Sequence, residues 1–192
     1  MIRKFFMLAV ALLTTAISFA DGPFRNHRYD AFKVLPVNSE QIVFIGNSIT
    51  NMHEWWEAFG NHNIVNRGVS GAITDEGLAN IEAIAAGKPK KVFIMLGTND
   101  LGTSGINTTE HVLQNVSLIV DRFKQTSPNT EIYVQSILPS ASGIRTLEAE
   151  QAANVALETM CTEKGATYID LWNAMRGITT NTHSYEYLHL TS

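Results

Sequence analysis

The stretch that decides the fold is residues 41–50, QIVFIGNSIT. Residues 41–45 form a short, mostly apolar run, and Gly46, Asn47 and Ser48 follow it directly. A continuous apolar run of this length is typical of a parallel strand that is covered on both faces of a sheet. We therefore interpret 41–45 as a buried strand with a polar loop at its carboxyl end.

The same strand pattern recurs along the chain and alternates with helical patterns. Strands are predicted at 41–45, 64–66, 92–96, 132–136 and 167–169, and helices near 52–59, 75–86, 108–126 and 146–164. The third helix carries an apolar stripe at the helical period, formed by Val112, Val116, Ile119, Val120 and Phe123. Regular alternation predicts the α/β class, here a three-layer α/β/α sandwich with a mostly parallel, flavodoxin-like five-stranded sheet.

The first forty residues differ from this pattern. Arg3 and Lys4 precede an apolar run over 5–13, and small residues lead to Ala20. Residues 1–20 therefore resemble a cleavable secretory signal peptide, with an uncleaved anchor as the alternative, although the run is short for a membrane span. Residues 21–40 are rich in turn formers and are interpreted as an exposed lead-in segment, so that residues 41–192 form the single folded domain.

Composition limits the function. The chain has 192 residues, of which 45% are hydrophobic and 17% charged, as in soluble globular proteins. Loss of Arg3 and Lys4 would move the formal charge from -4 to -6, which disfavours nucleic-acid binding. The single cysteine, Cys161, is expected to be a buried structural thiol. Because an exported chain with one cysteine cannot form an internal disulfide, we expect a bacterial periplasmic or secreted location. No stable membrane span is expected after signal cleavage.

Polar clusters follow four of the predicted strands. They are Gly46-Asn47-Ser48-Ile49-Thr50, Asn66-Arg67-Gly68-Val69-Ser70-Gly71, Gly97-Thr98-Asn99-Asp100 and, near the chain end, Glu186-Tyr187-Leu188-His189. Ligands of open α/β sheets bind beyond the carboxyl ends of the strands. We therefore expect the four clusters to meet at one edge of the sheet.

The residue types in these clusters suit acyl transfer. A serine hydroxyl needs a neighbouring base, and a neutral imidazole needs a partner that fixes its tautomer. Backbone amides of Ser48 and Gly71 and the side-chain amide of Asn99 are candidate donors to an oxyanion. No compact metal-ligand spacing, P-loop or dinucleotide fingerprint occurs, so neither a metal nor a cofactor is expected.

In their order, the four clusters resemble the blocks of the SGNH or GDSL hydrolase family. The resemblance covers the chain from residue 41 onward and implies Ser48 as nucleophile, His189 as general base, and Ser48, Gly71 and Asn99 as oxyanion-hole donors. Asn47 replaces the family's usual aspartate before the nucleophile. Glu186 stands where the family has an aspartate, three residues before the histidine, and is the candidate triad acid. The domain is expected to lack the family's C-terminal closing helix.

Other roles remain open for several of these residues. Ser48 could cap the following helix, Asn99 could stabilise a turn, and Glu186 could face solvent and leave a Ser–His dyad. His183 is the rival base, and Asp100 and Thr50 are expected to cap helices or fix loops. His53, Trp55 and Trp56 follow the nucleophile and either line the substrate entrance or, for Trp56, pack in the core.

The function predicted from the resemblance is hydrolysis of short-chain acyl esters through an acyl-enzyme. Acetyl esters on carbohydrates are the favoured substrates, which makes a small-molecule or glycan ester the expected partner. A lysophospholipase or thioesterase is the enzymatic alternative, and a catalytically silent glycan-binding relative is the alternative of another class.

Overall fold

A computed structural model describes residues 21–140, 145–175, 184–185 and 189–190, with side chains described over 22–140 and 145–175. The chain divides into two compact units, Met1–Leu35 and Pro36–Ser192. Within the described part, no helix has both the length and the apolar character that crossing a membrane requires. The predicted signal peptide, residues 1–20, lies outside the described residues.

The first unit contains helix α2, Asp21–Val34. The segment 21–40, interpreted as an exposed lead-in, is therefore helical over most of its length. Its turn formers Gly22 and Pro23 stand in the first turn, where proline is tolerated because the backbone N–H there has no partner within the helix. Pro36 follows one residue after the helix and disfavours helical backbone at Leu35.

The second unit is built on a five-stranded sheet whose strands are all parallel. Its strands are β1 (Ile42–Gly46), β2 (Ile64–Gly68), β3 (Lys91–Met95), β4 (Glu131–Gln135) and β5 (Thr167–Ile169). They lie in the order β2-β1-β3-β4-β5, which is the flavodoxin-like order. The five predicted strands are confirmed to within two residues at their ends, and so is the predicted fold class.

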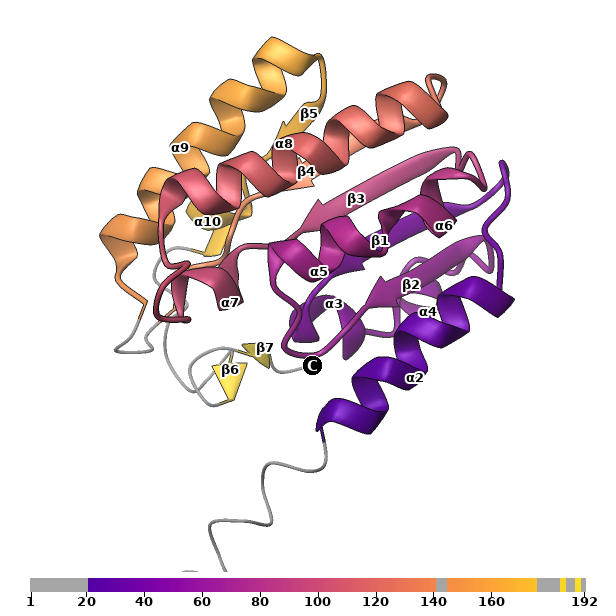
Figure 1. The fold of residues 1–192 in the computed structure, drawn as a ribbon, viewed down its shortest axis with the longest axis horizontal. Coiled ribbons are helices and arrows are strands. Elements are labelled where there is room, and N and C mark those ends of the chain that lie inside the picture. The colour runs from indigo at the N-terminus through magenta and orange to yellow at the C-terminus, as the bar shows by residue number, and fades with distance from the viewer. Residues whose placement is uncertain (1–20, 141–144, 176–183, 186–188, 191–192) are drawn as a thin grey trace, which may run out of the picture. The chain divides into compact units, whose positions relative to one another are not determined.

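Helices α5 (Thr74–Ala79), α6 (Ile81–Ala85), α8 (Thr109–Thr126) and α9 (Leu147–Lys164) form one layer. Figure 1 shows α5, α6 and α8 side by side on one face of the sheet. The five stripe residues predicted for α8 are all at most 1% exposed. They pack toward the alternate strand residues of that face, among them Val43, Val92 and Val134, which are also at most 1% exposed. The side chains between this helical layer and the sheet form the main hydrophobic core.

Shorter helices accompany the remaining segments. These are α3 (Ser48–Asn51), α4 (Trp55–Ala58), α7 (Thr98–Leu101) and α10 (Leu171–Met175). Near the chain end, β6 (Ser184–Tyr185) and β7 (His189–Leu190) form a two-stranded antiparallel pair. Three of these elements, α3, α7 and β7, carry residues of the predicted site.

The second face of the sheet is less completely covered by the described residues. Phe44, Phe93 and Tyr133 form a row of stacked rings across β1, β3 and β4, with centroids 4.7 and 4.6 Å apart. Trp55 of α4 stacks on Phe44 at 4.0 Å and completes its burial. Phe93 and Tyr133 are only half-buried. Among the described residues, the coverage that the apolar runs predict for both faces of the sheet is therefore complete on one face.

Candidate active site

Ser48 is the first residue of α3, directly beyond the carboxyl end of β1. The side-chain oxygen of Asn47 caps this helix by accepting a hydrogen bond from the Ile49 N–H at 3.0 Å. The capping role that was open for Ser48 is thus filled by Asn47. Ser48 itself is 6% exposed and begins a helix whose first N–H groups point outward from the helix end.

Asn66 of β2 fixes the other end of α3. Its Nδ2 donates to the carbonyl oxygens of Thr50 at 2.9 Å and Asn51 at 3.2 Å, while its Oδ1 accepts from the Gly68 N–H at 2.8 Å. Asn66 belongs to the second predicted cluster, but its sequence position alone did not predict this role. The residue type was the available sequence signal, because an asparagine side chain can donate a hydrogen bond through Nδ2 and accept another through Oδ1.

Gly68 lets β2 and α3 approach each other closely. A Cβ atom at this position would lie 2.7 Å from the Cα of Asn51, which no packed structure tolerates. The following segment then turns at Gly71, whose φ of 74° is readily adopted only by glycine. Ser70 Oγ donates to Asn51 Oδ1 at 3.0 Å, so the Gly71 segment is joined to the helix that Ser48 begins.

Asn99 is the second residue of α7, beyond the carboxyl end of β3. Gly97, with a φ of 116°, precedes this helix and turns the chain into it. Asn99 Nδ2 donates to the carbonyl oxygen of Ala72 at 3.0 Å, and Asn99 Oδ1 lies 3.4 Å from the donor Nη2 of Arg145. The three predicted oxyanion donors therefore stand on segments that are hydrogen-bonded to one another, from the ends of three adjacent strands.

His189 lies in β7, which contacts α3 and pairs with β6 so that His189 stands opposite Tyr185. The segment with the predicted base is thus beside the helix with the predicted nucleophile, although the structure does not describe the His189 side chain. Glu186, the predicted acid, and His183, the rival base, lie outside the described residues.

Asp100 follows Asn99 in the chain and is fully buried. Its carboxylate accepts from the Thr74 N–H at 3.0 Å and from the Thr74 hydroxyl at 2.5 Å. Burial raises the pKa of Asp100, and the hydrogen bonds from Thr74 oppose that rise. Asp100 therefore fixes the start of α5, in agreement with the loop-fixing role expected for it.

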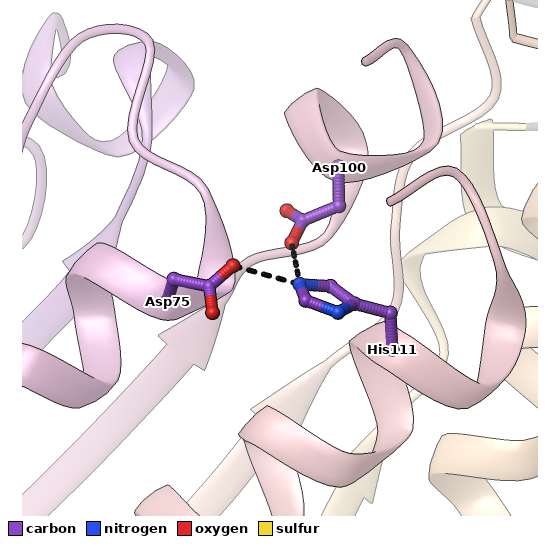
Figure 2. A group of neighbouring side chains, drawn as sticks. All are labelled: Asp75, Asp100 and His111. Carbon is purple, nitrogen blue, oxygen red and sulfur yellow. Dashed lines mark hydrogen bonds and ion pairs between the residues drawn. The ribbon is translucent and has the colours of Figure 1, made fainter. Parts of the chain in front are cut away.

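Asp75 and His111 lie beside Asp100, as Figure 2 shows. His111 Nε2 lies 2.7 Å from Asp75 Oδ2 and 3.8 Å from Asp100 Oδ1. Asn115 Nδ2 donates to the Thr74 hydroxyl at 2.9 Å. The sequence spacing did not predict this group.

Asp75, Asp100 and His111 are the described residues whose spacing comes closest to a metal site, because their ligand atoms lie within 4.8 Å of one another. Three hydrogen bonds from Thr74 already engage the Asp100 oxygens, and His111 Nε2 is engaged by Asp75. The amide of Asn115 also presents donors rather than acceptors to the group. The geometry is that of a hydrogen-bond network between α5, α7 and α8.

A cavity of about 820 Å³ lies against the half-covered face of the sheet. It is mostly apolar and is lined by the stacked rings of Phe44 and Phe93 together with His53 and Trp55, but none of Ser48, Gly71 and Asn99 lines it. Trp56 is 42% exposed and stacks on His62, so it belongs neither to the core nor to this cavity.

The site combines a helix that begins with Ser48 at a strand end with two neighbouring loops that carry amide groups, on a flavodoxin-like sheet. This combination is typical of α/β serine ester hydrolases. The sequence profile of the GDSL-like lipase/acylhydrolase family matches residues 44–192. The chain belongs to this family and is a serine ester hydrolase, as the sequence analysis predicted.

Solved structures share the fold. A protein from Streptococcus pneumoniae, whose description refers to platelet activating factor, is 26% identical with a TM-score of 0.78, covering 96% of this chain and 92% of that one. A lipase/acylhydrolase from Enterococcus faecalis is 19% identical with a TM-score of 0.67, covering 80% and 88%. An acetylxylan esterase from Geobacillus stearothermophilus is 17% identical with a TM-score of 0.64, covering 81% and 88%. No curated protein sequence matches this chain significantly.

Proposed function

We propose that the protein hydrolyses short-chain acyl esters, acetyl esters of carbohydrates above all, with Ser48 as nucleophile. The observation that carries the proposal is the joining of the Ser48, Gly71 and Asn99 segments at one edge of the sheet through the bonds of Ser70 and Asn99. This arrangement supports an oxyanion hole made of the Ser48 and Gly71 N–H groups and the Asn99 amide.

In the proposed reaction, the Ser48 hydroxyl oxygen attacks the ester carbonyl carbon while His189 accepts the hydroxyl proton. The carbonyl oxygen becomes an oxyanion, which the three donors stabilise. The tetrahedral intermediate then expels the alcohol, which takes the proton from His189, and leaves Ser48 acylated. A water molecule releases the carboxylic acid by the same steps, again with His189 as base.

Glu186 is proposed to orient His189 and to stabilise its charged form. The acetylxylan esterase described above supports this assignment, because its catalytic mutants replace a serine, an aspartate and a histidine, the last two three positions apart. Glu186 and His189 have that same separation. The acetyl group in the name of that enzyme also supports the proposed substrate class.

The first test compares p-nitrophenyl acetate with p-nitrophenyl esters of longer acids, for the wild type and Ser48→Ala. We expect hydrolysis of the acetate to be fastest and to fall by roughly 10³-fold or more in Ser48→Ala, because the nucleophile is lost. Thr159→Ala is the control, since its exposed hydroxyl only bonds its own helix on α9. Release of acetate from acetylated xylo-oligosaccharides would then identify the carbohydrate class.

The other outcomes distinguish the alternatives. A preference for long acyl chains would contradict the short-chain proposal and favour a lysophospholipase or thioesterase. Equal, slow hydrolysis by the wild type and Ser48→Ala would contradict catalysis by Ser48 and favour a glycan-binding relative. Export directed by residues 1–20, to a periplasmic or external location, is part of the same proposal.

A further inference from the structure

Two consecutive residues of α7 hold the segment that follows Gly71. Asn99 Nδ2 bonds the Ala72 carbonyl oxygen, and Asp100 bonds both the N–H and the hydroxyl of Thr74. Among the described residues, no other side chain of α7 forms a hydrogen bond to this segment. The backbone from Gly71 to Thr74 is thereby fixed at two points relative to α7.

The bond between Thr74 and Asp100 has a defined direction. Asn115 Nδ2 donates to the Thr74 hydroxyl oxygen at 2.9 Å, so the hydroxyl hydrogen is directed to Asp100 Oδ1. All three side chains are at most 7% exposed. Water therefore does not compete well for these bonds, and an unpaired partner there would be costly.

We propose that Asp100 is a positioning residue for the oxyanion hole, acting through Thr74 to set the place of the Gly71 N–H relative to the Asn99 amide. The inference rests on the proposed function. Asp100 does not touch the substrate. Its contribution is geometric, because a donor displaced by about 1 Å loses much of its effect on a developing oxyanion.

A matched pair of variants at Thr74 tests the link without altering any charge. Thr74→Ser keeps both bonds to Asp100, whereas Thr74→Val keeps the size of the side chain and the N–H bond but removes the hydroxyl. Asp100→Asn keeps the shape of the carboxylate but replaces one acceptor with a donor. Asp75→Asn is the control, since Asp75 is half-exposed and bonds His111 rather than Thr74.

The readouts are kcat and KM for p-nitrophenyl acetate, the rate of phosphonylation of Ser48 by a fluorophosphonate, and Tm. The phosphonyl oxygen occupies the oxyanion hole, so this rate reports the hole without deacylation. For Asp100→Asn and Thr74→Val we expect kcat and the phosphonylation rate to fall about 10- to 100-fold, with KM changed less than twofold. Thr74→Ser and Asp75→Asn should stay within twofold of the wild type.

Wild-type kcat in folded Asp100→Asn and Thr74→Val, with only Tm lowered, would overturn the inference and leave the proposed function standing. An equal loss in Asp75→Asn would also overturn it, since charge in the cluster rather than the Thr74 link would then be responsible. If Asp100→Asn does not fold, the comparison of Thr74→Val with Thr74→Ser decides. Equal rates for the wild type and Ser48→Ala would instead contradict the proposed function, and the inference with it.

Discussion

Glu150, on α9, carries a carboxyl group that is buried with few hydrogen-bond partners among the described residues. It is fully inaccessible to solvent, and its Oε2 accepts from the Ser140 N–H at 3.1 Å, whereas Oε1 has no hydrogen-bond partner among the described residues. Burial raises the pKa of Glu150 to about 7, and the Ser140 bond and the charge of Arg145 only partly oppose this. The folded protein therefore holds a proton at Glu150 under conditions in which the unfolded chain does not.

This difference predicts how stability depends on pH. Between the ordinary value of 4.5 and about 7, the folded state binds more protons than the unfolded state, so the free energy of unfolding should fall as pH rises through this window. The loss reaches at most about 3 kcal/mol. Glu150→Gln should flatten the dependence and have a higher Tm than the wild type at pH 8.

Urea denaturation at pH 5, 6.5 and 8 measures this effect. Glu148→Gln is the control, because Glu148 is exposed in the first turn of the same helix and should leave the pH dependence unchanged. An identical pH dependence in Glu150→Gln and the wild type would show that the Glu150 proton is not linked to folding.

Residue-level prediction from the sequence succeeded where a side chain has one plausible local role. The burial of Cys161 is confirmed at 1% exposed, and burial raises its thiol pKa to about 11. The capping role open for Ser48 belongs to Asn47, because a side chain one residue earlier reaches the Ile49 N–H. The burial of Glu150 could not be predicted, since it depends on loop residues after β4 that pack over the helix.

At the scale of elements, α3 is too short to be stable alone. A helix of four residues forms too few hydrogen bonds to offset the unfavourable nucleation step. The geometry of α3 therefore depends on contacts with the rest of the fold. Trp55 Nε1 and Asn66 Nδ2 both donate to the Thr50 carbonyl oxygen, at 2.8 and 2.9 Å. The hydrogen bonds at the C-terminal end of α3 therefore help to hold Ser48 in place at its N-terminal end.

Asn66→Asp tests this dependence. A carboxylate cannot donate and would face the carbonyl oxygens of Thr50 and Asn51, so we expect a loss of about 2–3 kcal/mol in the free energy of unfolding and a lower kcat. Asn61→Asp introduces the same charge but should change stability by less than about 0.5 kcal/mol, because Asn61 Oδ1 acts as an acceptor, from the Asn63 N–H. Urea denaturation and ester hydrolysis measure both variants, and equal stability for the two would contradict the proposed anchor.

Element boundaries were predictable where periodicity was long and were not where contacts decide. Helices α8 and α9 match the predicted spans to one residue. The apolar stripe of α8 and the residues that end the two helices, Pro128 and Gly165, are local signals. Of the predicted helix 52–59, Trp55–Ala58 is helical as α4, whereas α3 before it was not predicted. The predicted helix 75–86 is divided at Asn80 into α5 and α6.

At the scale of the whole molecule, the proposed export yields a prediction that needs no activity. When the full chain is expressed in a bacterium with a secretion pathway, cleavage after Ala20 should give a mature protein that begins at Asp21. Mass spectrometry of the periplasmic fraction measures the new terminus. A chain containing Leu12→Arg, which interrupts the apolar run, should remain unprocessed, and full-length protein in the wild-type culture would contradict the prediction.

The sequence by itself determined the class, order and approximate limits of the strands, because parallel strands and their helices have local hydrophobic patterns. It also placed the Ser48, Gly71 and Asn99 clusters at strand ends, since a flavodoxin-like sheet brings its carboxyl ends to one edge. The tertiary structure alone decided which side chains join these clusters. The side chains that form these bonds come from four different elements, namely Asn66, Thr74, Asp100 and Asn115. Their contacts depend on how the chain crosses between strands, and a local sequence pattern does not contain that information.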